Sequence, residues 1–311
     1  MHLALKKWTR KWWDSSAARS YNRRLVANNQ KSIVDACQGV SRIALVPKSP
    51  LGEGGSVEHY YHFLFDLLMP LLLLGKKLPE HFIVELEEVG PFMKSLPSLC
   101  GDLVSLCTSE EFTNKENKHS LLGMNPKAVR VDANELKSFR DGLLQRFDIK
   151  NVKPDIKRVL LIERQPPEAY FKSKECRVKG GGSERRSISN HDDLMRWLED
   201  NILEPFEFEN IQLEKCSFKD QMSLFNGASL VIAQHGAALA NIIWMQGDAQ
   251  VIEIGNDTTA THFKLIAGAR GIAHSLYPVD EAHCEIDFKD FSQWIGAHKE
   301  LDKFFKTFSL K

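Results

Sequence analysis

One stretch near the carboxyl-terminal end constrains the fold more than any other part of the chain. It begins with an apolar, β-branched run at residues 230–232, which is typical of a parallel strand covered on both faces. His235 and Gly236 follow where this strand stops, and Ala237 opens a helix directly. A second apolar run then carries Glu253 near its end. This order of strand, turn, helix and strand predicts part of a doubly wound parallel α/β sheet.

The same stretch predicts where a ligand binds. Open α/β folds bind ligands at the carboxyl ends of their strands, which is where His235, Gly236 and Ala237 fall. The first N–H groups of a helix lack partners within it and lie at its positive end, so they suit a phosphate. A side chain in place of Gly236 would keep the backbone away from that phosphate. Glu253 is predicted to accept a ribose hydroxyl, so the stretch indicates a cradle for a nucleotide diphosphate.

Three blocks of the chain resemble glycosyltransferase family 61. They are His-Gly-Ala-Ala-Leu-Ala-Asn at 235–241 with Val-Ile-Glu-Ile at 251–254, the strand ending on Arg164 with Arg-Ser-Ile-Ser-Asn at 186–190, and His-Tyr-Tyr-His-Phe-Leu-Phe-Asp at 59–66. The family contains plant xylosyl- and arabinosyltransferases, animal enzymes that add O-GlcNAc or elongate O-mannose glycans, and many bacterial polysaccharide enzymes. The resemblance implies a GT-B-like architecture, in which two Rossmann-like α/β domains face a cleft.

The order of predicted elements divides the chain into two domains. Residues 1–150 are predicted as an acceptor-side α/β domain, with strands near 42–46, 82–86, 103–106 and 128–131 and one long helix at 57–74. Residues 151–311 alternate strands and helices, as a nucleotide-sugar-binding Rossmann-like domain does. Pro154 and its polar neighbours are the predicted linker. A last helix at 288–305 is predicted to pack back across the junction.

Bulk composition excludes several classes of function. The 311 residues contain 41 Lys and Arg and 41 Asp and Glu, so the basic surplus of a nucleic-acid binder is absent. Six scattered cysteines show no metal-ligand spacing and favour reduced thiols in the cytoplasm. No signal peptide or membrane-spanning helix is predicted. Residues 5–13 combine tryptophan with lysine and arginine on opposite helix faces, which predicts peripheral contact with a membrane or packing against protein.

The donor site is predicted around His235. A lone histidine at a strand end is usually a core residue, but the family block favours contact with the donor's diphosphate or sugar. Arg164 ends a strand at the same edge, and Arg186 follows a basic loop that suits a lid over a diphosphate. Asn190 is predicted to cap the helix that follows it. Asn241, one turn into the helix after Gly236, is a further candidate, with local backbone bonding as the alternative.

The catalytic base is predicted in the amino-terminal half. His62 and Asp66 are four residues apart, so they share one face of an otherwise apolar helix. Burial of both among leucine and phenylalanine is unfavourable unless they pair or face a cleft. A paired carboxylate raises the basicity of an imidazole and fixes its tautomer, which suits a general base. Glu58 is the rival candidate, and a purely structural His–Asp bond is the alternative.

The sequence contains no Asp-x-Asp motif, so neither a bound metal nor another cofactor is expected. Backbone donors and arginine would stabilise the leaving group instead. The resemblance implies an inverting, metal-independent transfer of a sugar from a nucleotide-sugar, with a UDP-sugar as first choice. The acceptor is predicted to be a saccharide or lipid-linked saccharide in bacterial polysaccharide synthesis. The alternatives are a transferase that uses a CMP-activated acidic sugar and a non-catalytic nucleotide-binding scaffold.

Overall fold

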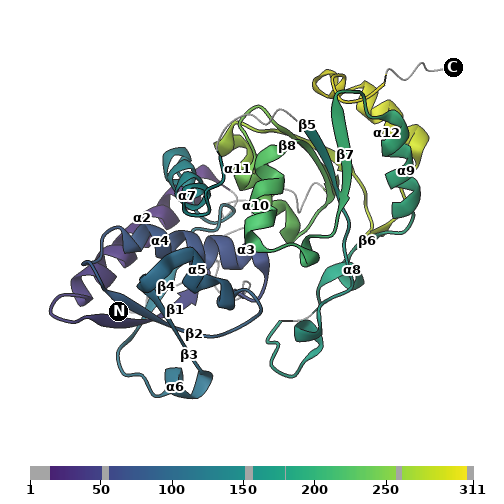
Figure 1. The fold of residues 1–311 in the computed structure, drawn as a ribbon. Helices are drawn as coiled ribbons and strands as arrows, with labels where there is room; N and C mark the ends of the chain where they lie inside the picture. Colours follow the sequence, from purple (N-terminus) through teal and green to yellow (C-terminus); the bar gives the residue numbers. More distant parts are fainter. Residues whose placement is uncertain (1–14, 51–55, 151–156, 179, 257–260, 307–311) are drawn as a thin grey trace. The chain divides into compact units, whose positions relative to one another are not determined.

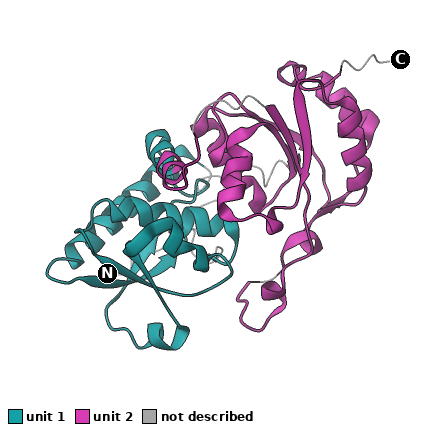
Figure 2. Ribbon diagram, viewed as in Figure 1, with its two compact units in different colours: residues 1–139 teal, residues 140–311 magenta. Residues whose placement is uncertain are grey.

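A computed structural model describes residues 15–50, 56–150, 157–178, 180–256 and 261–306 of this chain (Figure 1). The chain divides into two compact units, residues 1–139 and residues 140–311 (Figure 2). Each unit has its own parallel sheet. The predicted amphipathic segment at 5–13 and the predicted linker around Pro154 lie outside the described residues, and the predicted boundary after residue 150 stays a prediction.

The sheet of unit 1 has four parallel strands in the order β3-β2-β1-β4. The strands are β1 (Arg42–Lys48), β2 (Ile83–Glu87), β3 (Val104–Cys107) and β4 (Lys118–Leu122). Strands β2 and β3 thus lie on one side of β1, and β4 lies on its other side. This reversal makes the carboxyl ends of β1 and β4 the topological switch point of unit 1.

One strand prediction in unit 1 is wrong. Residues 128–131 form no strand, because the N–H groups of Ala128 and Val129 bond to the carbonyl of Asn125 in a turn. Ala128 and Val129 are buried in that turn. The fourth strand is instead β4, whose sequence Lys-His-Ser-Leu-Leu is polar at its start. Its only partner strand in the described sheet is β1, so it lacks the apolar run of a central strand.

Four α-helices accompany this sheet in the described part of the chain, apart from the segment that follows β1. They are α2 (Ser16–Ala36), α5 (Leu96–Cys100), α6 (Ser109–Thr113) and α7 (Ala133–Arg146), and α7 runs on into unit 2. The 3₁₀ turns η2 (Met93–Ser95) and η3 (Gly101–Leu103) lie beside α5. Helix α2 was not predicted from the sequence, because the polar residues Asn22 and Gln30 interrupt its buried face. Ser15 caps α2 by accepting the Ala18 N–H.

The segment after β1 is predicted as one regular helix, but the structure divides it into three parts. These are α3 (Tyr60–His62), a π-helical turn η1 (Phe63–Leu68) and α4 (Met69–Gly75). The Met69 N–H bonds to the carbonyl of Leu64, five residues earlier. Pro70 has no N–H for the carbonyl of Phe65, which instead accepts the N–H of Met124 at 2.6 Å. The wider turn thereby joins the helical segment to the chain just beyond β4.

The sheet of unit 2 has five parallel strands in the order β10-β9-β8-β5-β7. The strands are β5 (Lys157–Ile162), β7 (Phe206–Ile211), β8 (Ala228–Gln234), β9 (Gln250–Gly255) and β10 (Ala273–Pro278). Numbered by appearance within the sheet, this order is 2-1-3-4-5, the flavodoxin-like form of a doubly wound sheet. Its switch point lies between β5 and β8. The prediction of an α/β fold with parallel sheets is confirmed.

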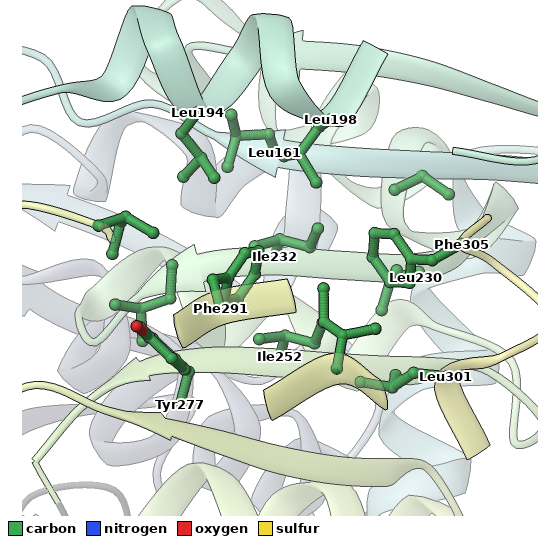
Figure 3. Packing of buried hydrophobic residues seen from close by; sticks show 14 of the residues in the cluster. Leu161, Leu194, Leu198, Leu230, Ile232, Ile252, Tyr277, Phe291, Leu301 and Phe305 are labelled. Carbon is green, nitrogen blue, oxygen red and sulfur yellow. The ribbon is translucent and has the colours of Figure 1, made fainter. Parts of the chain in front are cut away.

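Helices cover both faces of this sheet (Figure 1). On one face lie α9 (His191–Asn201), α12 (Phe288–Gly296) and the 3₁₀ turn η7 (Lys299–Leu301), and on the other lie α10 (Phe218–Gly227), α11 (Thr261–Arg270) and the 3₁₀ helix η6 (Ala237–Trp244). Alternate strand residues such as Leu161 and Ile232 pack against Leu198 and Phe291 in the core of the first face (Figure 3).

Two helix predictions in unit 2 are corrected. The helix predicted from Ala237 is a 3₁₀ helix and not an α-helix. The last helix ends at Gly296, and the residues after it, including Phe304, pack into the core of unit 2 itself. Two-residue strands β6 (Ser187–Ile188) and β11 (His283–Cys284) pair in parallel, and short turns α8 (Gly182–Arg185), η4 (Ala169–Lys172) and η5 (Leu213–Lys215) complete the unit.

All six cysteines are free thiols. Within the described residues, no helix has both the length and the apolar character needed to cross a bilayer.

Candidate functional site

Arg164 and His235 meet at the switch point of unit 2. They follow the neighbouring strands β5 and β8, so both lie at the carboxyl edge of the sheet. Arg164 donates from Nη1 to the carbonyl oxygen of His235 at 3.1 Å and from Nη2 to the carbonyl oxygen of Gly182 at 3.0 Å. Its Nε is buried and has no hydrogen-bond partner in the described structure. The guanidinium is therefore held in place by backbone carbonyls, which leave its charge uncompensated.

The structure gives a reason for Gly236 in addition to the predicted approach to a phosphate, which stays a prediction. A Cβ at this position would lie 2.0 Å from Nη1 of Arg164. The backbone of Gly236 is extended, with φ 170° and ψ 177°, so the residue is selected by space and not by backbone conformation. Glycine lets the arginine lie across the turn between β8 and η6. Ala237, the first residue of η6, is partly exposed beside it.

Positive charge accumulates around Arg164. Burial and the nearby charges of Arg186 and Arg185 lower the pKa of Arg164 to about 10, against the opposing effect of Glu214. Burial and the charge of Arg185 also lower the pKa of Arg186, while Glu253 opposes this. None of the three arginines forms a salt bridge within the described residues. An arrangement of this kind is prepared for an anion that brings the missing negative charge.

His235 belongs to a buried hydrogen-bonded group of three side chains. Its Nδ1 lies 2.5 Å from Oε1 of Glu253, and Nε2 of His274 lies 2.7 Å from Oε2 of the same carboxylate. Glu253 is fully buried, yet its pKa is lowered: burial acts to raise it, and hydrogen bonds and charge from the two histidines outweigh that effect. The carboxylate is thus ionised and accepts from both rings, which makes His235 the Nδ1–H tautomer when neutral.

His274 is not among the site residues predicted from the sequence. The register pairs Leu276 of β10 with Glu253 of β9, and His274 lies two residues before Leu276 on the same face of its strand. A histidine diagonal to a buried glutamate was the available signal. Both oxygens of Glu253 are occupied in this structure, whereas the predicted contact with a ribose hydroxyl stays a prediction.

The two asparagines at this edge bond to protein. Asn190 lies at the N-cap position of α9, but its side chain caps nothing, so that part of the prediction is wrong. Its amide instead donates to the carbonyl of Ile286 at 2.9 Å and accepts the Ile286 N–H at 3.0 Å. Asn241 is fully buried; it donates to Gln221 at 3.0 Å and accepts from Trp244 at 3.0 Å. These bonds hold α9 and η6, and a ligand contact for either residue stays a prediction.

Unit 1 contains His62 and Asp66, the residues predicted to form the catalytic base. Nδ1 of His62 lies 2.6 Å from Oδ2 of Asp66 across the start of the π-helical turn. The side chain of Asp66 is 2% exposed and that of His62 is 17% exposed. Burial raises the pKa of Asp66, although the bond and charge of His62 and the nearby Ser49 side chain and Asn125 backbone oppose this. His62 is therefore the member of the pair that a substrate can reach.

The rival candidate is less accessible. Glu58 is fully buried and accepts a 2.6 Å hydrogen bond from Oγ of Ser56. Gly90 packs against its backbone, since a Cβ there would lie 2.9 Å from Cα of Glu58. This packing favours His62 over Glu58 as the group that exchanges protons with an acceptor.

In the described part of the chain, no group of three or more His, Cys, Asp or Glu side chains is placed to hold a metal ion. This observation does not test whether the reaction needs a metal ion, so metal independence stays a prediction.

Comparison with known proteins identifies the family. The sequence profile of the family described as Glycosyltransferase 61 matches residues 60–252, which is more than half of the chain. The chain belongs to glycosyltransferase family 61. The match begins in α3, ends one residue before Glu253, and includes His62, Arg164, Arg186 and His235.

Two curated relatives are similar over different lengths. The xylan glycosyltransferase MUCI21 of Arabidopsis thaliana is 23% identical over 302 residues, which are 88% of this chain and 58% of that protein. The EGF domain-specific O-linked N-acetylglucosamine transferase of Drosophila melanogaster is 26% identical over 105 residues, 32% of this chain and 20% of that protein. This family 61 chain therefore spans less than two thirds of the length of either relative.

Proposed function

We propose that this protein is an inverting, metal-independent glycosyltransferase that uses a nucleotide-diphosphate sugar. The observation that carries the proposal is the group formed by Arg164, Arg185 and Arg186 beside His235 at the switch point of unit 2. Three cations that form no salt bridge with any described carboxylate would bind the diphosphate of a donor and stabilise it as a leaving group. UDP is the first choice of nucleotide, in line with the resemblance of the chain to its family.

The acceptor is proposed to be a saccharide or lipid-linked saccharide in surface polysaccharide synthesis. Both curated relatives are named as enzymes that glycosylate larger molecules, a xylan and a protein domain. The basic, tryptophan-bearing segment at 5–13 supports work at the cytoplasmic face of a membrane. A GT-B arrangement, with acceptor and donor units facing a cleft, forms part of the proposal.

His62 is proposed as the general base. With Nδ1 donating to the ionised form of Asp66, Nε2 can take the proton of the acceptor hydroxyl as its oxygen attacks C1 of the donor sugar. The bond between C1 and the diphosphate breaks as the new glycosidic bond forms, with inversion at C1. The leaving diphosphate takes both electrons of the broken bond, and the arginines of unit 2 balance its charge.

A nucleotide panel tests the donor half of this proposal. Thermal unfolding is measured with UDP, GDP and CMP, because a ligand at 100 times its Kd stabilises a protein by about 2.7 kcal/mol. UDP is expected to raise the Tm most. A response to CMP alone would favour a transferase of CMP-activated acidic sugars.

The base is tested with His62→Ala. We expect kcat to fall by about 10²–10⁴-fold, because a positioned base contributes that much, while the Kd of the nucleotide stays close to that of the wild type. A folded variant with near-normal kcat would remove His62 from the reaction and make Glu58 the residue to test. Nucleotide binding by a wild-type protein that transfers no sugar would favour the scaffold alternative.

A further inference from the structure

His274 has no part in the proposed function. It lies in β10, beyond the residues 60–252 that match the family. Its side chain is 5% exposed, and its Nε2 lies 2.7 Å from Oε2 of Glu253. His274 is therefore connected to His235 in the proposed donor site through two hydrogen bonds, one on each oxygen of Glu253.

Glu253 depends on both of its histidines. The carboxylate is fully buried, and each oxygen has one histidine partner, His235 on Oε1 and His274 on Oε2. An ionised carboxylate only accepts hydrogen bonds, so each ring must present an N–H to it. Loss of His274 would leave Oε2 buried without that partner, which strongly disfavours the charged form.

Charged and titratable groups surround this carboxylate from several elements. His235 reaches it from the end of β8, His274 from β10, and the charge of Arg186, just after α8, acts on it from a distance. The ring of His262 in α11 lies 5.2 Å from the ring of His235, edge to face. Removal of His274 therefore deletes one of the two hydrogen bonds that lower the pKa of Glu253, while its burial, which raises that pKa, remains.

We infer that His274 is a positioning residue for the donor site: it holds Glu253, and Glu253 in turn keeps His235 in the Nδ1–H tautomer, with Nε2 left for the diphosphate. The part of this inference that concerns the diphosphate rests on the proposed function. The part that concerns the tautomer of His235 does not, because the three side chains are in contact without any ligand.

Three variants separate a positioning role from a structural one. His274→Phe keeps a ring of similar size and removes the donor. His274→Gln restores a donor, since its amide nitrogen reaches about as far as Nε2 of histidine. Ser275→Ala is the matched control, because Ser275 lies next in β10 and bonds away from the site, to Glu300 at 3.2 Å.

Two measurements are made on the full chain. The first, without nucleotide, uses ¹⁵N-labelled histidine and long-range ¹⁵N–¹H NMR correlations to read the tautomer of His235, assigned with His235→Gln. The second is calorimetric titration with UDP between pH 5 and pH 8.

We expect His274→Phe to lose the single Nδ1–H tautomer and to bind UDP about tenfold more weakly or worse, a difference of about 1.4 kcal/mol. The defect should grow as the pH falls, because protonation of Glu253 removes the acceptor for His235. His274→Gln should keep the tautomer and bind UDP within about threefold of the wild type, and Ser275→Ala should match the wild type in both.

An unchanged tautomer and an unchanged Kd in folded His274→Phe would overturn the inference, as would a Ser275→Ala defect of equal size. If His274→Phe does not fold, His274→Asn, whose shorter amide does not reach Oε2, is compared with His274→Gln by the same criteria. If the tautomer changes but the wild type does not bind UDP, the positioning of His235 stands and the proposed donor fails.

Discussion

Each unit contains a histidine paired with a buried carboxylate, yet the two carboxylates differ. Glu253 has a histidine on each oxygen and a lowered pKa, whereas Asp66 has one histidine at 2.6 Å and a raised pKa. Oδ1 of Asp66 has no hydrogen-bond partner within the described residues. Burial outweighs the bonds and charge that oppose it at Asp66, whereas the bonds and charges of the two histidines outweigh burial at Glu253.

The two carboxylates should affect stability in opposite directions. A raised pKa means that the folded state holds its proton more tightly, so the contribution of Asp66 falls as the pH rises from 3.8 through the raised value. The contribution of Glu253 is present above 4.5 and is lost as the pH falls through its lowered value. At pH 7 we therefore expect Asp66→Asn to keep or raise the Tm while kcat falls, and Glu253→Gln to lower the Tm.

Melting curves of both variants from pH 3 to pH 8 check these signs. A lower Tm in Asp66→Asn at pH 7, together with an unchanged Tm in Glu253→Gln, would contradict this account of the two pairs.

Gly236 provides a second test at the scale of a single residue. In Gly236→Ala the new Cβ would meet Nη1 of Arg164, and the end of this side chain can move, so the protein should fold. Displacing a charged donor is worth about 1.5–3 kcal/mol, which corresponds to a Kd for UDP weakened by about 10- to 100-fold.

Gly268→Ala is the control, since its Cβ meets nothing within 4 Å in α11. It should bind UDP normally and gain about 0.5–1 kcal/mol in stability. Equal affinities in the two variants would argue against Arg164 as a donor-site residue.

The sequence predicted most elements but not their finer geometry. The apolar runs of β5, β8 and β9 are central strands, buried on both faces, so their pattern is clear. The helix after β1 and the helix after Gly236 were expected to be regular, yet one contains a π-helical turn and the other is a 3₁₀ helix. Periodicity alone does not separate these forms, because the choice depends on tertiary bonds such as Met124 to Phe65. The sequence predicted which residues share one edge of the sheet. It did not predict that Arg164 lies against Gly236 or that His274 bonds to Glu253, because these contacts depend on the directions of side chains.

The π-helical turn and β4 act together on Asp66. A Cβ at Gly123, just after β4, would lie 2.1 Å from Oδ1 and 2.6 Å from Cα of Asp66. Backbone cannot move aside as a side chain can, so Gly123→Ala should be destabilised by about 1–3 kcal/mol and should lose the His62–Asp66 bond. We expect a lower Tm and a kcat reduced toward that of His62→Ala. Gly142→Ala in α7, where a Cβ meets nothing within 4 Å, should show neither effect. Normal kcat in Gly123→Ala would mean that the position of Asp66 does not matter for the reaction.

At the scale of the molecule, the two units repeat one structural principle. Each has a parallel sheet whose strand order reverses, β1 beside β4 in unit 1 and β5 beside β8 in unit 2. In each, the candidate chemical groups lie near the carboxyl ends of the strands at the reversal: the His62–Asp66 pair beside Gly123, and Arg164 with His235. This is where open α/β sheets bind ligands. In the proposed function the donor binds to unit 2 and the base lies in unit 1.

The central claim is that the arginine group of unit 2 binds the donor diphosphate without a metal ion, and calorimetric titration with UDP in excess EDTA tests it most directly. The wild type should bind UDP under these conditions. Arg164→Gln should bind about tenfold more weakly or worse, because hydrogen bonds from a charged donor contribute about 1.5–3 kcal/mol. UDP binding that disappears in EDTA and returns with Mn²⁺, or an Arg164→Gln variant with the affinity of the wild type, would contradict the claim.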